Sequence, residues 1–219
     1  MDGLLNGSAA LIVPDFEQET HTYRYFDVAP SVTDILKAIG IGHKAATDGG
    51  YEVPEDTMEY ARDRGQDIHA AAQLLLENDL DWDSLEEDVL PYIVGLQNWV
   101  DKTGFVPDLI EQSFYCPEYD YAGTIDFTGW IGEEYWLIDL KTGGAGKKPW
   151  HHKQMAAYAY PLRRHGIWPF RMVLELKQTT KRGYTPHPLP PSETEWDWTV
   201  FLAARTIYAD LIQGKKALG

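Results

Sequence analysis

Hydrophobic residues are spaced along this chain in two different ways. Over residues 57–77 and 85–104 they recur every three to four positions, which predicts amphipathic helices. Residues 108–116, 120–130, 134–141 and 170–178 are rich in β-branched, aromatic and leucine side chains or alternate with polar ones, which predicts strands. With a strand at 21–28 and helices at 31–40, 151–164 and 192–213, the predicted order is strand, three helices, three strands, helix, strand and helix.

Short polar patterns mark the predicted helix ends. A serine followed three residues later by an acid is typical of a helix N-cap, because the serine oxygen accepts a hydrogen bond from a free backbone amide. Gly40 and Gly104 are predicted to end the first and third helices. The three serine pairs are Ser31 with Asp34, Ser84 with Glu87, and Ser192 with Glu195.

The helix over residues 57–77 has a clear apolar stripe. His69 lies beside this stripe, and on its own such a histidine is typical of a structural position. The stripe runs through Met58, Ala61, Ile68, Ala72 and Leu75.

The order of elements favours one α/β domain, with a central mixed β-sheet flanked by helices and N-terminal helical additions. The chain has 219 residues, of which 44% are hydrophobic and 24% charged, a composition typical of a globular protein with one core. We expect a strand and helix extension over residues 1–56, the central part over 57–180 and a C-terminal helix over 181–219.

The sequence offers no membrane segment and little thiol chemistry. No run approaches the roughly 20 apolar residues of a membrane helix, and Met1-Asp2-Gly3 lacks the basic flank of a signal peptide. We therefore expect a cytoplasmic protein without a membrane partner. Cys116 is the single cysteine, so the chain alone can form neither an internal disulfide nor a four-cysteine site. Its apolar surroundings predict a small buried side chain.

Charge is distributed unevenly along the chain. The net charge of −15 on its own disfavours a nucleic-acid partner, because Lys and Arg dominate phosphate binding. From Lys141 to Arg182, however, ten basic residues accompany one acid, Glu175, so this segment carries +9 and the remainder −24. The basic segment 141–182 predicts a polyanion-binding face or, alternatively, a solvated patch.

A tight hairpin is predicted around Gly132-Glu133, between the strands at 120–130 and 134–141. Residues that face each other across this turn have numbers that sum to 265, so Asp126 falls opposite Asp139. Lys141 shares their face, and the other face is predicted to be the core. That core face holds Ile125, Phe127, Trp136, Ile138 and Leu140.

Two opposed carboxylates require a positive partner. Like charges that face each other across a sheet are destabilising, and each carboxylate makes its neighbour harder to ionise. Lys141 supplies one positive charge, and a hard divalent cation, which prefers oxygen ligands, would supply more. A solvent-exposed pair of Asp126 with Lys141 is the alternative, but it leaves Asp139 unexplained.

Four short patterns follow one another through the middle of the chain. They are Gly65-x-x-x-His69, then Gly123-Thr124-Ile125-Asp126, then Ile138-Asp139-Leu140-Lys141-Thr142-Gly143, and then Gln154 with Tyr158 as Q-x-x-x-Y. In this order they resemble the RecB-like branch of the PD-(D/E)XK nucleases. Pro30-Ser31-Val32-Thr33 before a short helix is similar to phage-borne members. Ile125 stands where the name motif has proline, which departs from the superfamily pattern but suits this branch.

The resemblance implies a restriction-endonuclease-like αβββαβ core, catalytic over residues 57–180, that holds one or two Mg²⁺ or Mn²⁺ ions. Asp126, Asp139 and His69 are the implied metal ligands. Glu111 matches an acidic position in relatives, and the backbone carbonyl of Leu140 is a further implied ligand.

The resemblance also assigns roles around the metal. Lys141 is implied to be catalytic by positioning or activating water, and Gln154 and Tyr158 to line the catalytic site. Branch members with an iron–sulfur cluster carry four cysteines, so no cluster is expected here.

The implied activity is that of a DNA nuclease, an exonuclease or a single-strand-preferring enzyme of phage or prophage recombination or repair. Duplex ends or single-stranded DNA would be bound, with a recombination protein or a second copy of the chain as a further partner. Two alternatives stay open: a nuclease fold retained as a non-catalytic nucleic-acid-binding module, and a metal-dependent hydrolase of another phosphate ester.

Basic and aromatic residues near these patterns are the candidates for DNA contact. The glycine-rich segment carries Lys147 and Lys148 to the DNA backbone or is a plain solvated loop. Lys153 on the next helix is a third basic candidate. Trp150, and with it Tyr158 and Tyr160, would stack on unpaired bases or belong to the core.

Overall fold

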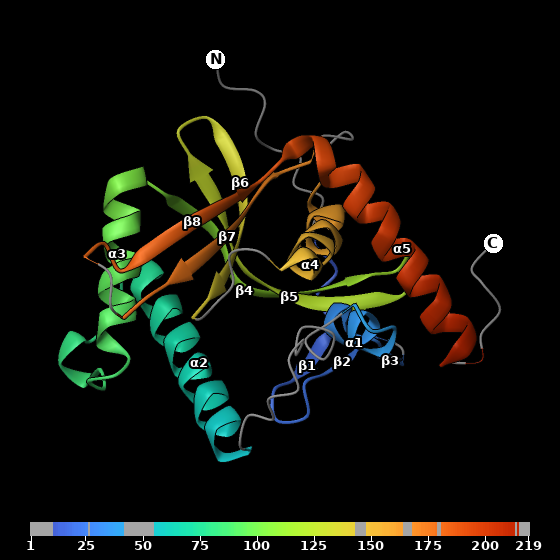
Figure 1. Cartoon of the computed structure of the whole chain (residues 1–219), viewed down its shortest axis with the longest axis horizontal. Helices are drawn as coiled ribbons and strands as arrows, with labels where there is room; N and C mark the ends of the chain where they lie inside the picture. Colours follow the sequence, from blue (N-terminus) through green and yellow to red (C-terminus); the bar gives the residue numbers. More distant parts are fainter. Residues whose placement is uncertain are drawn as a thin grey trace.

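Five strands form a mixed sheet at the centre of the computed structural model, in the order β4-β5-β6-β7-β8 (Figure 1). Neighbouring strands are antiparallel except β6 and β7, which are parallel and joined through α4 (Pro149–Ala159). The predicted α/β class with a central mixed sheet is confirmed. The strands are β4 Val106–Cys116, β5 Tyr121–Ile131, β6 Glu134–Lys141, β7 Phe170–Leu176 and β8 Tyr184–Leu189.

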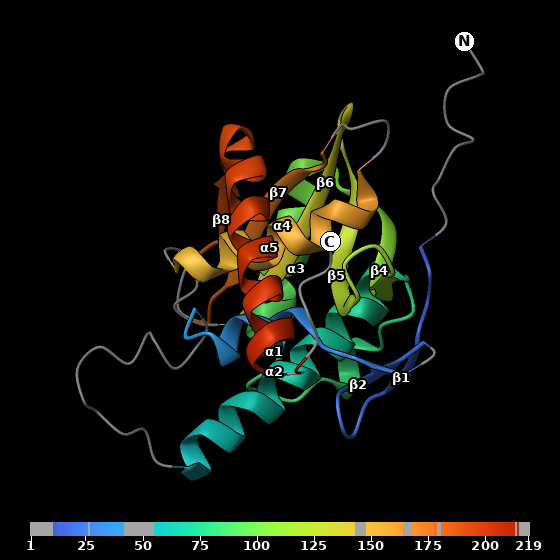
Figure 2. The same ribbon diagram turned by 90° about the vertical axis from the view of Figure 1, so that its right-hand side faces the viewer.

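Helices cover both faces of this sheet. α2 (Glu55–Leu76) and α3 (Leu90–Thr103) lie on one face, and α1 (Val32–Ala38), α4 and α5 (Thr194–Leu211) on the other (Figures 1 and 2). Single 3₁₀ turns are η2 Trp82–Ser84, η3 Tyr160–Leu162 and η4 Pro191–Glu193. The structure describes residues 11–25, 27–41, 55–142, 148–163, 168–178, 181–212 and 214. Within these ranges no helix combines the length and the apolar character needed to cross a membrane.

A small antiparallel sheet precedes α1. It consists of β1 (Asp15–Glu17), β2 (Thr22–Arg24) and β3 (Val28–Ala29), so the strand predicted over 21–28 is two short strands with a turn between them. Isolated bridges join Ile12 to Tyr115 and Ser31 to Ala122, and they attach this region to the β4–β5 end of the main sheet (Figure 2).

The predicted hairpin register is confirmed. Gly132 adopts the left-handed φ of 62° that the turn needs, and the paired residues of β5 and β6 sum to 265 from Ile131 with Glu134 to Phe127 with Ile138. Asp126 and Asp139 follow directly beyond the last of these pairs.

The prediction of a single core face is wrong. Phe127, Ile138 and Leu140 pack beneath α2 and α3 as expected. Leu137, predicted on the polar face, is fully buried in a second core with α4 and α5, and Ile125 lies in that same core. Helices cover both faces, so both faces of the central strands must be largely apolar. Ile125 and Phe127 are two residues apart on β5 but lie in opposite cores, so the alternation of β5 is interrupted between them, opposite Glu111 with its φ of 46°.

One of the three predicted serine caps is present. Ser31 accepts a hydrogen bond from the backbone N–H of Asp34 at 3.0 Å and caps α1. Ser84 instead ends the 3₁₀ turn η2, and Ser192 lies within η4, before an α5 that has no side-chain cap. Gly104, with φ 66°, ends α3 as predicted.

Strand β8 was not predicted, because Pro186 and Pro188 lie within it. Proline cannot donate to a sheet ladder and is therefore confined to edge strands and irregular positions. β8 is an edge strand of the main sheet, and this position accommodates both prolines. Residues beyond 180 thus supply a strand of the sheet as well as the C-terminal helix.

Only the second half of α2 packs on the sheet. Ile68 and Ala72 are fully buried, whereas Ala61 of the predicted stripe is exposed and the side chain of Met58 lies outside the described residues. Figure 1 shows the N-terminal half of α2 extending past the sheet. His69 lies in the packed half, which holds it against β4 and β5.

Candidate metal centre

Three residues that are far apart in the sequence converge where α2 crosses β4 and β5. His69, Glu111 and Asp126 each offer a ligand atom, and these atoms all lie within 4.8 Å of one another. The Nδ1 atom of His69 lies 2.9 Å from Oε1 of Glu111 and 4.0 Å from Oδ1 of Asp126. One histidine nitrogen and two carboxylates are a donor set for a divalent metal ion.

Glu111 reaches this cluster through an unusual backbone. Its φ is 46°, in the left-handed region that residues with a side chain rarely adopt. Its neighbours stay in register, since Ile110 pairs with Phe127 and Gln112 pairs with Ile125. The distortion is therefore confined to the position opposite Asp126.

Asp126 and Asp139 are close in the hairpin but turn to different partners. Oδ2 of Asp126 accepts a hydrogen bond from the backbone N–H of Leu140 at 2.6 Å. Lys141 Nζ lies 2.8 Å from Oδ1 and 2.7 Å from Oδ2 of Asp139. Repulsion between buried carboxylates explains this divergence. Asp126 thus joins the His69 cluster, while Asp139 joins Lys141 beside it.

Burial dominates the titration of these acids. It raises the pKa of Asp126, against the opposing charges of His69 and Lys141, and it raises the pKa of Asp139, against Lys141. Lys141 shows the reverse balance, because burial alone would lower its pKa but the charges of Asp139, Asp126 and Glu111 raise it. Lys141 therefore remains protonated at neutral pH.

Burial raises the pKa of Tyr158 on α4, and the charges of Asp139 and Asp126 act in the same direction, so its hydroxyl lies near these carboxylates. Gln154 Nε2 donates to the Tyr158 hydroxyl at 3.0 Å, and both side chains are buried. A Cβ atom at Gly123 would come within 2.7 Å of the Tyr158 ring, so the glycine makes room for this tyrosine. Oε1 of Gln154 is buried and has no hydrogen-bond partner among the described residues.

The residues present fit a divalent cation. Three carboxylates, Glu111, Asp126 and Asp139, meet Lys141 and His69; Asp139 is buried, and the other four side chains are partly buried. The raised pKa of both aspartates means that more positive charge would stabilise their ionised forms. His69, Glu111 and Asp126 would hold the ion, and Asp139 would join them once its pair with Lys141 opened. The side chain of Leu140 lies in the core, and its backbone amide serves Asp126.

Metal binding is expected to displace a proton from His69. Burial lowers the pKa of His69, but Asp126 and the hydrogen bond with Glu111 outweigh it and raise the pKa from 6.5 to about 9. The protonated imidazole therefore stabilises the metal-free protein fully below pH 6.5, and this contribution is lost as the pH rises through about 9. We expect Mn²⁺ to release about one proton at pH 7, measured by titration calorimetry in buffers of different ionisation enthalpy.

The matched control for this titration is His69→Gln, which should bind Mn²⁺ more weakly and release no proton from this position. Identical heats for the unmodified protein in all buffers would mean that His69 keeps its proton and is not a ligand.

The candidates for DNA contact occupy different positions. Lys153 Nζ donates to Asp197 at 2.9 Å. Its charge is neutralised by this carboxylate, whereas a contact with a DNA phosphate was expected. Tyr158 and Tyr160 are buried, and Tyr160 stacks on Trp198, so both serve the core and not base stacking. Trp150 is partly buried with its ring against His151.

Only part of the basic segment 141–182 is available to a polyanion. Like Lys153, three of its members form ion pairs: Lys141 with Asp139, Arg171 with Asp197, and Lys177 with Glu175. Lys148 is partly exposed at the start of α4, and Lys181 and Arg182 are exposed. Lys147 lies outside the described residues.

A second group with metal-ligand atoms, His152, Glu193 and Asp197, is already neutralised. Asp197 is almost fully buried and pairs with Arg171 at 3.1 Å and with Lys153 at 2.9 Å. The charges of Arg171 and Lys153 oppose the binding of a metal ion to the same carboxylate. The two ion pairs instead connect α4 and β7 to α5.

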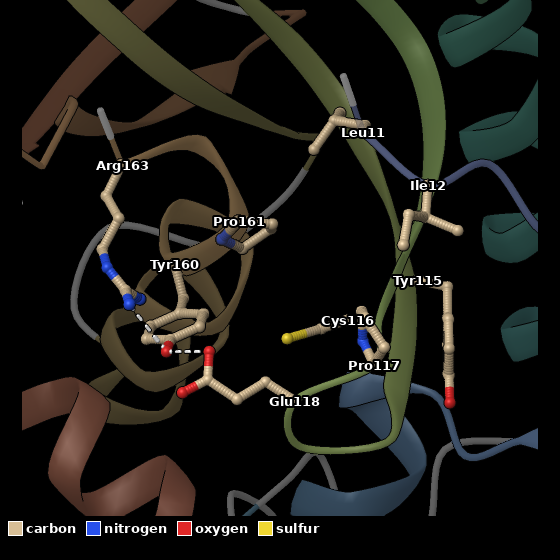
Figure 3. A pocket seen from close by; sticks show the side chains of 9 residues that line it. All are labelled: Leu11, Ile12, Tyr115, Cys116, Pro117, Glu118, Tyr160, Pro161 and Arg163. Carbon is tan, nitrogen blue, oxygen red and sulfur yellow. Dashed lines mark hydrogen bonds between the residues drawn. The ribbon is translucent and has the colours of Figure 1, made fainter. Parts of the chain in front are cut away.

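A pocket of about 280 Å³ lies beside the turn between β4 and β5, away from the metal centre (Figure 3). Its wall includes Cys116, whose burial is confirmed. Tyr160 donates to Glu118 at 2.6 Å, and Arg163 donates through one guanidinium nitrogen to the Tyr160 hydroxyl at 2.7 Å. None of the residues assigned to the metal site lines this pocket.

Sequence patterns missed one buried group next to the metal centre. The Tyr23 hydroxyl lies 2.9 Å from Oγ1 of Thr124, two residues before Asp126. No motif marks Tyr23, because its position depends on how the small sheet docks.

Comparison with models of known protein families gives no match to this chain, and comparison with curated proteins gives no significant match.

Proposed function

We propose that this chain is a divalent-metal-dependent nuclease that hydrolyses phosphodiester bonds of DNA, with Mg²⁺ or Mn²⁺ as the ion. The observation that carries the proposal is the convergence of His69, Glu111 and Asp126 within 4.8 Å beside the Asp139–Lys141 pair. These are the residues expected from the RecB-like pattern, and they come from three separate elements of an α-βββ-α-β arrangement.

The chain's own groups have separable tasks in this proposal. His69, Glu111 and Asp126 hold the ion, and a bound divalent cation would polarise the scissile phosphate and lower the pKa of a coordinated water. Lys141 keeps its proton and so acts as a fixed positive charge for the transition state, not as a general base. In the metal-free protein both carboxylate oxygens of Asp139 orient Lys141, and Asp139 would turn to the ion once this pair opened.

Gln154 and Tyr158 close the site from α4. The unpartnered Oε1 of Gln154 provides an acceptor, and its Nε2 fixes the Tyr158 hydroxyl. Lys148, at the start of the same helix, is the described residue of the glycine-rich segment placed to meet the DNA backbone. A helix that carries both a phosphate contact and the wall of the site would couple DNA binding to site geometry.

The test is a cleavage assay with Mg²⁺ or Mn²⁺ on linear duplex, circular duplex and single-stranded DNA, with Asp126→Asn purified in parallel as the matched control. We expect metal-dependent degradation of at least one substrate and none by the control variant. No degradation of any DNA would contradict the proposal. DNA binding that survives EDTA without cleavage would indicate a binding module, and turnover of small phosphodiesters alone would indicate another phosphate ester as the substrate.

A further inference from the structure

The small N-terminal sheet reaches the metal centre through one buried tyrosine. Tyr23 of β2 is 1% exposed and packs with Ala29 and Ala122. The bridge between Ser31 and Ala122 holds the sheet against β5 at this point. The N-terminal region therefore places a hydroxyl group within the main sheet's polar site.

Three hydroxyl groups form a chain across β2, β5 and β4. The Tyr23 hydroxyl lies 2.9 Å from Oγ1 of Thr124, and the same Thr124 atom lies 3.0 Å from Oγ of Ser113. Thr124 precedes Asp126 by two residues on β5, and Ser113 follows Glu111 by two residues on β4. Ser113 pairs with Thr124 across β4 and β5, so the hydroxyl chain crosses the sheet two residues away from the position where Glu111 lies opposite Asp126.

The Glu111 carboxylate is carried by an irregular part of β4. Glu111, with φ 46°, holds a backbone conformation that costs on the order of 1–3 kcal/mol and persists only where its surroundings impose it. The hydroxyl chain ties β4 to β5 directly beside that position. It thereby fixes how far the Glu111 and Asp126 carboxylates lie from each other.

Tyr23 is also electrostatically linked to the site. Burial raises the pKa of Tyr23 to about 12, and the charges of Asp34, Asp126 and Glu111 act in the same direction. Its hydroxyl therefore stays protonated across the working range of the protein, so that it can always take part in the chain. His21, whose φ is 50°, brings its Nε2 atom to 3.4 Å from the same hydroxyl, and Phe16 stacks on the Tyr23 ring.

We propose that Tyr23 is a positioning residue of the metal centre, which acts through Thr124 and Ser113 to set the spacing of the Glu111 and Asp126 carboxylates. The inference rests on the proposed metal-binding function. It makes the N-terminal sheet a working part of the site and not only a packing element.

The test compares Tyr23→Phe with Tyr135→Phe by calorimetric titration of Mn²⁺. Tyr135 is a matched control, because its hydroxyl lies 2.8 Å from Oγ1 of another threonine of β5, Thr128, which is also two residues from Asp126 but accepts from the Leu109 amide and is not part of the Tyr23–Thr124–Ser113 chain. Removal of groups that orient metal ligands typically weakens affinity about 10–100-fold. We expect the Kd for Mn²⁺ to rise at least about tenfold in Tyr23→Phe and to stay within about twofold in Tyr135→Phe.

A second pair of variants covers the case in which Tyr23→Phe fails to fold. Thr124→Ser keeps the bridging hydroxyl and Thr124→Val removes it, so Ser should retain metal affinity and Val should lose it. Equal Kd values for Tyr23→Phe and the unmodified protein, or for the two Thr124 variants, would overturn the positioning role while leaving the proposed nuclease intact. Absence of Mn²⁺ binding by the unmodified protein would overturn both.

Discussion

Replacing Asp126 with asparagine is expected to abolish DNA cleavage while leaving the metal-free melting temperature unchanged or raised. Burial raises the pKa of Asp126 in the folded protein. Above the pKa that Asp126 has in the unfolded chain, its ionisation therefore lowers the free energy of unfolding, and acidification restores it. Asparagine keeps an oxygen for the Leu140 amide but carries no charge. We expect activity to fall by at least about 10²–10³-fold and the melting temperature in EDTA to rise by up to about 2–4 °C.

Asp139→Asn separates the two carboxylates. It should be as inactive as Asp126→Asn. Burial raises the pKa of Asp139 as well, but the substitution also removes the charge that both of its oxygens present to Lys141, so any gain in stability should be smaller. The unmodified protein should gain roughly 2.7 kcal/mol from Mn²⁺ at a hundredfold excess over Kd, and both variants should gain less. Retained cleavage by either variant, or unfolding of both without metal, would mean that these carboxylates are structural.

Replacing Lys141 with alanine is expected to be the most damaging single change at the site. The Asp139 side chain is 2% exposed and would lose its only ion-pair partner among the described residues. Breaking a buried pair in this way typically costs about 3–5 kcal/mol. We expect cleavage to be lost and the protein to melt well below the unmodified chain in EDTA at pH 8.

Acid and metal should each rescue that stability. The pKa of Asp139 is already raised and rises further without Lys141, so the penalty is present at pH 8 and is relieved as Asp139 becomes protonated at low pH. Mn²⁺ should raise the melting temperature of Lys141→Ala more than that of the unmodified protein, because the ion replaces a missing charge. Lys141→Met restores apolar volume but not the charge, so it should be as inactive and as unstable in EDTA as Lys141→Ala. DNA cleavage by either variant would show that Lys141 is not needed for catalysis.

Local patterns predicted the hairpin correctly because its determinants are local. A glycine suited to φ 62° and the alternation of the residues next to it are enough to fix the register from Ile131 with Glu134 to Phe127 with Ile138, directly before Asp126 and Asp139. The directions of the two carboxylates could not be predicted in the same way. They depend on Lys141 and on His69, which a distant helix brings to the hairpin.

Two serine caps failed for a related reason. Ser84 and Ser192 carry the local signature, but η2 is capped by Asp81 and α3 begins at Leu90, followed by Pro91, a residue that favours a helix start. At the second site α5 begins at Thr194, after the single turn η4. Where several helix-start signals lie close together, the serine pattern alone does not predict at which residue the helix begins.

The hairpin register indicated a cation beside Asp126 and Asp139, whereas His69 and Glu111 were assigned to the candidate site through a resemblance. His69, Glu111 and Asp126 are separated by 42 and 15 positions, and no periodicity links them. Tyr23 was missed because it carries no pattern of its own and gains its position only when the small sheet docks on β5. Contacts between segments that are distant in the sequence cannot be predicted from local patterns.

The prolines of β8 have a consequence for how copies of this chain meet. An open sheet edge presents unpaired amides and carbonyls that can template strand addition and aggregation. At β8, Pro186 and Pro188 remove two donors, and at the opposite edge β4 carries an irregularity between Pro107 and Leu109 and a bridge from Ile12 to Tyr115. Neither edge strand offers an uninterrupted row of free hydrogen-bonding groups. The sheet edges therefore give a second copy of the chain little opportunity to add a strand and aggregate.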